Sequence, residues 1–381
     1  DTVVLEQVRA GKLLEDAREG GCSGCIETGA FGKEAYILTG YLNVPKLLEL
    51  ALNNGIDPLT GMKIGIETGD PRQFENYEQL FDAFLKQLDY VVDLKIRVNN
   101  YIERMFAQNA PAPFLSVVIS DCIEKGRDYY DGGPRYNTNY IQCCGIGTVT
   151  DSFSAIKKHV FEDQTVSMEG LQNALARNFE DAEALRMRLW NKTPFYGNDD
   201  DFADDIMKAV YDALFKTIDG RPNTKGEVYH LNMLSTTCHV YFGKMLGASA
   251  NGRFAGLPIS DGTSPSHGAD KNGPTAVIKS LGKMDQSKSG GTLLNQRFLP
   301  QVLKTEKDLD KLALLIRSYF KLNGHHIQFN IVDTDTLKKA QKHPDDFRDL
   351  LVRVAGYSDY FVDLDEYHQS EIIHRTAHES V

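Results

Sequence analysis

The sequence is short of cysteine, of basic residues and of long apolar runs, and each shortage excludes a class of protein. Six cysteines in 381 residues are too few for a disulfide scaffold. No apolar stretch is long enough to span a membrane. Lysine and arginine total 42 against 53 aspartates and glutamates, a net charge of −11, and no basic cluster interleaves with aromatic residues. This acidity argues against nucleic acid and anionic membranes as partners and favours a small-molecule substrate.

The N-terminus lacks an initiator methionine, a basic leader and a cleavage site, because the chain begins Asp1-Thr2-Val3-Val4. Without a secretory signal we expect a reducing, cytoplasmic location, in which a functional cysteine acts as a free thiol. The same start leads us to expect that the chain is part of a longer protein. The remaining composition, 41% hydrophobic and 25% charged, is typical of a globular protein with a large core.

Apolar periodicity predicts helices and strands that alternate along the chain. Apolar residues repeat at three and four positions over 77–108, which predicts a long helix. Proline or aspartate at the start of a pattern predicts shorter helices at 45–55, 153–161 and 345–354. β-branched or alternating runs predict strands at 115–120, 140–150 and 327–332. Strands separated by helices indicate a parallel α/β fold, and no linker divides it, so we expect one domain or part of one.

A glycine-rich segment near the N-terminus, Gly20 to Gly29, concentrates two thiols and a carboxylate. Cys22 and Cys25 have C-x-x-C spacing, but a zinc site needs four ligands and no second pair is spaced to supply them. Both cysteines could instead be small buried hydrophobic residues in a turn. A third interpretation pairs Cys25 with Glu27. In an extended backbone the two side chains face the same way, which places a sulfur and a proton-transferring carboxylate against one substrate.

A second motif lies near the C-terminus. The segment Arg353 to Phe361 contains Arg-Val-x-Gly-Tyr-Ser around Gly356, and Glu-Ile-Ile-x-Arg-Thr follows at 371–376. Taken alone, Gly356 would be an ordinary turn or C-cap glycine. The two runs together closely resemble the signature of the glycyl radical enzymes, the family of pyruvate formate-lyase and its relatives. Glycine suits such a radical, because it has no Cβ to clash and its flanking amides stabilise an unpaired electron on the α-carbon.

The resemblance implies roles for three residues. Gly356 would store the radical, Cys25 would become the thiyl radical that attacks substrate, and Glu27 would act in acid/base chemistry beside it. A radical S-adenosylmethionine activating enzyme with a [4Fe-4S] cluster would install the radical, so we expect the chain itself to bind no cofactor and no metal. The adjacent Cys143 and Cys144 match the two cysteines of pyruvate formate-lyase. They lack the Cys-x-Glu context, however, and we interpret them as packing in a strand.

The family resemblance covers the whole chain and implies a fold. Segments 251–262 and 324–330 resemble family segments that form barrel loops and walls. Complete members are about twice as long and close a ten-stranded barrel from two halves. We therefore expect the second half, a parallel five-stranded half-barrel surrounded by helices, with a pyruvate formate-lyase-type portion and the cysteine loop in 1–260 and a glycine radical domain in 261–381. The missing N-terminal half of the barrel would be a partner, and the full-length protein would be a homodimer.

Within the family, the run from Glu27 to Asn43 is most similar to the members that dehydrate trans-4-hydroxy-L-proline. The similarity implies a hydro-lyase reaction that yields 1-pyrroline-5-carboxylate, with Tyr41 touching substrate through its hydroxyl. Tyr41 could equally be a packed core residue. Alternatives that share Cys25, Glu27 and Gly356 are 4-hydroxyphenylacetate decarboxylase and the diol dehydratases or choline lyase. From another class, the chain could be a non-catalytic fragment or a spare-part subunit that replaces a damaged radical loop.

Three other patterns predict no ligand site. His325 and His326 are adjacent next to an expected strand, where neighbouring side chains face opposite ways. The acidic run 198–201 lacks the glycine and the glutamate that a calcium-binding loop needs at fixed positions. Gly145 and Gly147 lack the third glycine of a dinucleotide-binding fingerprint.

Overall fold

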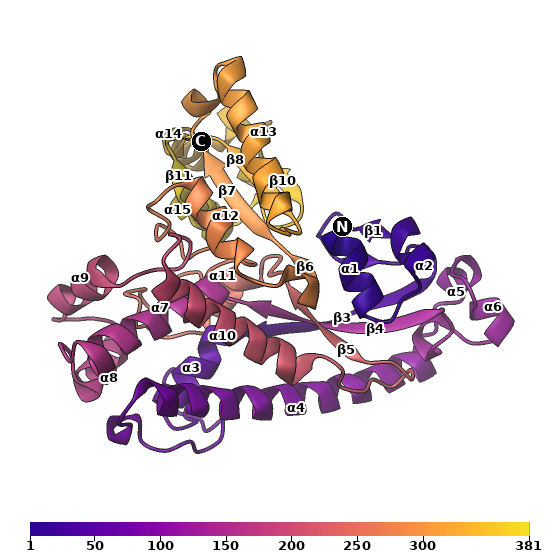
Figure 1. Cartoon of the computed structure of the whole chain (residues 1–381), viewed down its shortest axis with the longest axis horizontal. Coiled ribbons are helices and arrows are strands. Elements are labelled where there is room, and N and C mark those ends of the chain that lie inside the picture. The colour runs from indigo at the N-terminus through magenta and orange to yellow at the C-terminus, as the bar shows by residue number, and fades with distance from the viewer. Residues whose placement is uncertain (381) are drawn as a thin grey trace.

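Parallel strands wrapped by helices form the protein, and its computed structural model describes residues 1–380 (Figure 1). A four-stranded parallel sheet has the order β3 (Glu34–Asn43), β4 (Tyr136–Cys144), β5 (Tyr229–Met233), β6 (Ser289–Thr292). A three-stranded parallel sheet has the order β11 (Ala377–His378), β7 (Leu294–Phe298), β8 (Ile327–Ile331). Only Leu293 separates β6 from β7 in the chain, so these two short strands connect the larger sheet to the smaller one. With β6 and β7 taken as one interrupted strand, the parallel strands run in the order β3, β4, β5, β6–β7, β8. This arrangement confirms the expected α/β class of parallel half-barrel strands surrounded by helices.

Helices cover one face of the larger sheet because the strand side chains on that face are apolar. Ile141 and Cys143 alternate along β4 and pack in one core cluster with Leu80, Phe84 and Leu88. These three residues lie on α4 (Tyr77–Asn109), which begins at the N-cap Asn76. Three more helices belong to this layer: α3 (Val44–Leu52), α7 (Ile146–Ile156) and α10 (Asp201–Ile218). Figure 1 shows α4 running along the length of β3, β4 and β5.

The opposite face of the larger sheet is covered near the N-terminus by the first helix. Tyr140 points to this face, and its hydroxyl donates to Glu6 at 3.5 Å. The remaining helices of the described chain are α1 (Thr2–Arg9), α2 (Leu14–Glu19), α5 (Pro113–Val118), α6 (Cys122–Lys125), α8 (Met168–Ala176), α9 (Glu183–Lys192), α11 (Cys238–Lys244), α12 (Pro274–Gly282), α13 (Glu306–Lys321), α14 (Thr334–Lys342) and α15 (Glu366–His374). Within residues 1–380, no helix is both long and apolar enough to cross a membrane.

Long, regular sequence patterns predicted their elements correctly. α4 occupies the run predicted over 77–108, α3 forms within the predicted 45–55, and β8 occupies most of 327–332. The helix predicted at 153–161 starts earlier, as α7, and continues as a π-helical segment over Lys157–Glu162. Every residue of α7 is buried, so no exposed polar face marks where the helix begins.

Three sequence predictions are wrong where local signals compete. The run 115–120 is not a strand, because Pro113 opens the helix α5 there. The run 345–354 is helical only at its start, where Pro344–Phe347 forms a short 3-10 helix, and its end forms strand β9 (Leu351–Arg353), which pairs with β10 (Ser358–Tyr360). The expected strand at 140–150 is split, since Gly145 at φ 89° ends β4 and begins α7. In these three cases Pro113, the pairing of β9 with β10, and Gly145 respectively decide the local structure against the propensity of the surrounding residues.

Two short antiparallel hairpins bring segments from opposite ends of the chain together. β1 (Gly21–Cys22) pairs with β2 (Thr28–Gly29) and encloses the cysteine loop, and β9 pairs with β10 and encloses Gly356. Between them lies a small apolar group that we call the loop cluster, formed by Ile26, Leu234, Leu293 and Ala355, with Cys25 packed against it. The one-residue break between β6 and β7 therefore lies beside both loops.

Candidate active site

The cysteine loop is a tight turn that presents Cys25 and Glu27 from a single hairpin. The backbone N–H of Ile26 donates to the Ser23 carbonyl at 3.0 Å, and the Ser23 N–H donates to the Glu27 carbonyl at 2.8 Å. Ile26 has φ 81°, a left-handed conformation that a β-branched residue rarely adopts. The sequence-based interpretation required an extended backbone at this position, whereas the structure has a turn. The turn, held by the burial of Ile26 in the loop cluster, brings the two side chains together instead.

The glycine loop meets the cysteine loop at the backbone. Gly356 is buried and has φ 88°, again in the left-handed region. A Cβ built on Gly356 would lie 2.8 Å from the Cys25 Cα and 3.2 Å from the Cys25 Cβ. A side chain cannot fit in that space, so the position requires glycine both for its conformation and for the contact. The α-hydrogen that points in this direction faces Cys25 directly.

Polar side chains from β8 and α15 hold the hairpin that carries Gly356. The Gly356 N–H donates to Gln328 Oε1 at 3.2 Å. Asn330 pairs with the Arg353 backbone in both directions, since its Nδ2 donates to the carbonyl and its Oδ1 accepts from the N–H, each at 2.8 Å. Arg375 Nη2 donates to the Val354 carbonyl at 2.8 Å. The residues on the N-terminal side of Gly356 are thus tied to the rest of the molecule by side chains.

The environment of Cys25 keeps its thiol protonated. Burial raises the pKa of Cys25, the negative charge of Glu27 raises it further, and Arg353 acts weakly in the opposite direction. A protonated thiol holds a hydrogen atom that a carbon radical can remove, whereas a thiolate does not. The side chain is only partly buried, so it contacts the loop cluster on one side while remaining open on another. The electrostatics therefore favour hydrogen-atom transfer over nucleophilic attack.

Glu27 is almost fully buried, with 9% of its surface exposed, and is oriented by a neighbour in the same turn. The Ser23 hydroxyl donates a hydrogen bond to Glu27 Oε2, and the same hydroxyl accepts from the Cys25 N–H at 3.3 Å. One serine thus connects the carboxylate to the backbone of the cysteine. Sequence reasoning missed Ser23, although its position two residues before Cys25 in a turn-rich segment is typical of a hydroxyl that caps a tight turn.

Tyr41 lies near the end of β3. Its hydroxyl is 2.9 Å from the Thr236 hydroxyl, and its ring packs on a group that includes Cys144 and Ile259. Burial raises the pKa of Tyr41, so the phenol stays protonated and can donate. Thr236, at φ 49°, is a second polar residue that the sequence did not reveal, because it is far from Tyr41 in the chain.

The surroundings of Cys22, Cys143 and Cys144 indicate packing and hydrogen bonding within the fold. All six cysteines are free of disulfides in the described chain. The Cys22 thiol donates to the Ile26 carbonyl at 3.0 Å, and burial together with Glu27 raises the pKa of Cys22 to about 12. Cys143 and Cys144 are fully buried on β4, as the sequence interpretation expected. The geometry therefore places Cys25, and not the adjacent pair, against Gly356.

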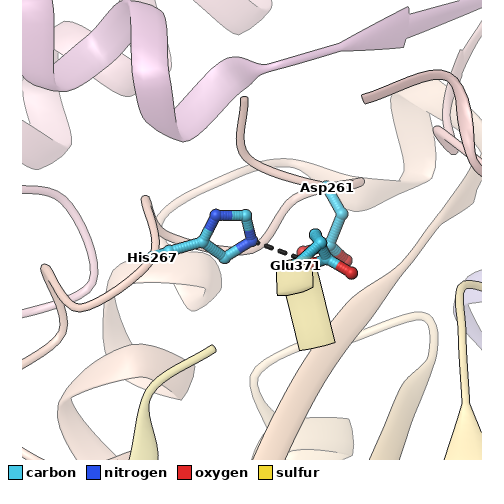
Figure 2. Close-up of side chains that lie close together, drawn as sticks. All are labelled: Asp261, His267 and Glu371. Carbon is cyan, nitrogen blue, oxygen red and sulfur yellow. Dashed lines mark hydrogen bonds and ion pairs between the residues drawn. The ribbon is translucent and has the colours of Figure 1, made fainter. Parts of the chain in front are cut away.

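A charged group lies behind the glycine loop. Figure 2 shows Asp261, His267 and Glu371 side by side, with potential ligand atoms within 4.8 Å of one another. His267 Nε2 lies 3.0 Å from Glu371 Oε1, and His239 Nε2 lies 3.4 Å from the same atom. Arg375 donates to both oxygens of Glu371 at 2.8 Å, so the charge of this carboxylate is already balanced. Glu371 and Arg375 form a buried ion pair beside the two other residues, and the expectation that the chain binds no metal stays a prediction.

A glycine α-carbon and a protonated thiol that meet on two opposing loops form the arrangement expected of a glycyl radical protein. Residues 1–243 match the family model described as pyruvate formate lyase-like, and residues 259–362 match the glycine radical model. The chain therefore belongs to the pyruvate formate lyase-like family of glycyl radical enzymes.

Individual relatives are similar over nearly the whole chain. Trans-4-hydroxy-L-proline dehydratase of Clostridioides difficile is 57% identical over 376 residues, which are 99% of this chain and 48% of the relative. A solved structure of hydroxyproline dehydratase from Clostridioides difficile, with trans-4-hydroxy-L-proline bound, matches with a TM-score of 0.98 at 57% identity, covering 99% of this chain and 48% of that one. The glycerol-bound B12-independent glycerol dehydratase from Clostridium butyricum matches with a TM-score of 0.95 at 36% identity and the same coverage. The chain spans about half the length of the curated relatives it matches.

Proposed function

We propose that this chain carries the two catalytic loops of a glycyl radical hydro-lyase. Gly356 stores the radical, Cys25 relays it to substrate and Glu27 transfers a proton. The observation that carries this assignment is the contact between the loops, in which a Cβ on Gly356 would lie 2.8 Å from the Cys25 Cα. In that position the glycyl radical takes a hydrogen atom from the Cys25 thiol, which restores glycine and leaves a thiyl radical.

The substrate we propose is trans-4-hydroxy-L-proline, because the 57% identical relative is a dehydratase of that compound. The thiyl radical removes the hydrogen from the ring carbon between the nitrogen and the carbon that bears the hydroxyl. Glu27 gives a proton to the hydroxyl, which leaves as water. The nitrogen then forms a C=N bond, and the proton that it loses returns to the Glu27 carboxylate. The unpaired electron moves to the carbon that carried the hydroxyl, and that carbon recovers a hydrogen atom from Cys25. The product is 1-pyrroline-5-carboxylate, and Tyr41 contacts the substrate through its hydroxyl.

The partners we propose follow from the same assignment. A radical S-adenosylmethionine activating enzyme with a [4Fe-4S] cluster removes a hydrogen atom from Gly356, so the cofactor belongs to that enzyme. The relatives contain a further segment that this chain does not span, and an equivalent segment completes the substrate pocket. The complete protein forms a homodimer. We also propose that residues 1–260 and 261–381 form the barrel portion and the glycine radical domain.

A product assay tests the substrate. Anaerobically activated protein is incubated with trans-4-hydroxy-L-proline, and the pyrroline product is detected by its adduct with an aromatic aminoaldehyde. Cis-4-hydroxy-L-proline serves as the stereochemical control. Product from the trans isomer supports the assignment. A protein that carries a full glycyl radical and forms no pyrroline contradicts this substrate and favours an arylacetate, a diol or choline instead. Absence of any radical contradicts the whole assignment and favours a non-catalytic role.

A further inference from the structure

The strand β8 has a polar face that points at the glycine loop. Gln328 and Asn330 occupy alternate positions on this strand, each with 5% of its surface exposed, whereas the neighbouring Ile327 and Phe329 face the apolar core. The alternation is visible in the sequence, where it indicates only an ordinary half-buried strand. In the structure the two carboxamides bond different parts of the same hairpin. Asn330 bonds the backbone of Arg353, and Gln328 bonds Gly356 itself.

Both polar atoms of the Gln328 carboxamide are engaged. Its Oε1 accepts the Gly356 N–H at 3.2 Å and two donations from Arg353, from Nε at 3.2 Å and Nη2 at 3.0 Å. Its Nε2 donates to Asn295 Oδ1, and Asn295 Nδ2 in turn donates to Asp261 Oδ2. Because Asp261 can only accept when ionised, this chain of donors fixes which way each amide points. The oxygen of Gln328 therefore faces Gly356.

An acceptor at this position matters for a radical on the α-carbon. Such a radical is stabilised because the amide nitrogen gives electron density and the carbonyl withdraws it, and both effects need the peptide planes to align with the half-filled orbital. A hydrogen bond accepted from the Gly356 N–H holds that peptide plane in place. The hydrogen bond also leaves more electron density on the amide nitrogen, so that the nitrogen donates more of it to the α-carbon radical.

We propose that Gln328 is a positioning residue for the stored radical, acting through the amide of Gly356. This role rests on the radical function proposed above. Other contacts hold the hairpin without touching the glycine amide, since Asn330 bonds Arg353 and Arg375 bonds the Val354 carbonyl. Loss of Gln328 should therefore change the radical more than it changes the fold.

Three variants separate this role from simple packing. Gln328→Met removes the acceptor with little change in side-chain length. Gln328→Glu keeps an oxygen toward the Gly356 amide and toward Arg353 but removes the donation to Asn295. Gln296→Met is the matched control, because Gln296 is a buried glutamine on β7 whose Nε2 donates to the Pro274 carbonyl at 3.5 Å and not to the hairpin that carries Gly356.

The three variants and the parent protein are activated anaerobically, and electron paramagnetic resonance gives the spins per chain, the line shape and the rate of signal loss without substrate. We expect Gln328→Met to lower the spin yield or the lifetime about fivefold, the worth of one hydrogen bond, and to broaden the spectrum. Gln296→Met should match the parent, and Gln328→Glu should keep a parent-like lifetime.

The outcomes distinguish this role from the underlying function. A parent protein without a radical overturns the proposed function. A normal parent radical, with Gln328→Met equal to Gln296→Met in yield, line shape and lifetime, overturns the role of Gln328 alone. If thermal unfolding shows that Gln328→Met does not fold, the lifetime of the radical in Gln328→Glu tests the role of Gln328. An unstable radical in that folded variant shows that the acceptor is not what matters and overturns the proposal.

Discussion

Gly356 and Cys25 approach each other so closely that a methyl group on the glycine would lie 2.8 Å from the cysteine Cα. The two residues come from opposite ends of the chain and from separate hairpins. Their contact is packed by Ile26 on one loop and Ala355 on the other. Neither backbone can move toward the other or away without disturbing this small cluster, so their separation is set by packing.

Gly356→Ala should abolish radical formation and destabilise the hairpin. Alanine is strained at φ 88°, at a cost of about 1–3 kcal/mol, and its methyl group would also collide with Cys25. Gly11→Ala is the control, because Gly11 has φ 89° but nothing within 4 Å of the added methyl group. Chemical denaturation and spin counting measure the two effects. A Gly356→Ala protein with the stability of Gly11→Ala would contradict the close contact.

Cys25→Ser should abolish turnover while leaving the glycyl radical intact, because an O–H bond is too strong for the glycyl radical to break. Cys143→Ser is the matched control, since Cys143 is fully buried on β4 and packs in the core on the side of the sheet that the helices cover. We expect that variant to keep activity once corrected for the amount of folded protein. Product formation per spin is the measurement. The opposite ranking of the two variants would show that the wrong thiol was assigned.

Glu27→Gln should lower the rate of dehydration by about 10²- to 10⁴-fold, the usual contribution of a positioned proton donor, without lowering the radical yield. Ser23→Ala should have a smaller effect on kcat, because it removes only the hydroxyl that orients the carboxylate. Ser116→Ala provides a control, since Ser116 is remote and donates to Asp128. Equal kcat in Ser23→Ala and the parent would show that Glu27 needs no orientation from this turn.

Acid should weaken the anchoring of α15. Burial alone would raise the pKa of Glu371, but Arg375 and the adjacent histidines hold it well below its ordinary value of 4.5. This carboxylate therefore contributes stability above pH 4.5, and the contribution is lost as the pH falls toward its folded-state pKa. Urea unfolding followed from about pH 6 down to about pH 2 measures the slope, which should appear below pH 4.5.

Glu371→Gln removes that titration and leaves Arg375 as a buried unpaired charge. We expect this variant to lose about 3–5 kcal/mol of unfolding free energy at neutral pH and to show a flatter pH dependence. Glu379→Gln, an exposed position beyond the helix, should change neither quantity. A Glu371→Gln protein as stable as the parent would mean that the ion pair contributes little to holding α15.

The sequence predicted the parts of this molecule that depend on local pattern or on a long motif. The helix α4 was predicted from its periodicity, because its apolar stripe is long enough to exclude other periods. Cys25, Glu27 and Gly356 were selected by the motifs around them. The strand expected at 115–120 is wrong, because a six-residue run with only four apolar residues fits a strand or a helix equally well, and Pro113 favours the start of a helix.

The contacts that form the site could not be predicted from the sequence, because they join residues that are far apart in the chain. Gln328 and Gly356 are bonded across two sheets, and Tyr41 meets Thr236 through a loop that precedes α11. The turn at Ile26 was also missed, since a β-branched residue is the least expected one in a left-handed conformation. Its place is fixed by the loop cluster, which no local pattern encodes.

The hairpin of β9 and β10 is a sheet of its own, not a continuation of β7 and β8. Its polar attachments near Gly356 are side-chain hydrogen bonds from Gln328, Asn330, Arg375 and Asn295, and Val352 and Val354 pack in a buried apolar cluster. Each hydrogen bond is worth about 1 kcal/mol, and none of them belongs to a strand ladder. A movement of this hairpin would therefore break side-chain contacts and leave both parallel sheets intact.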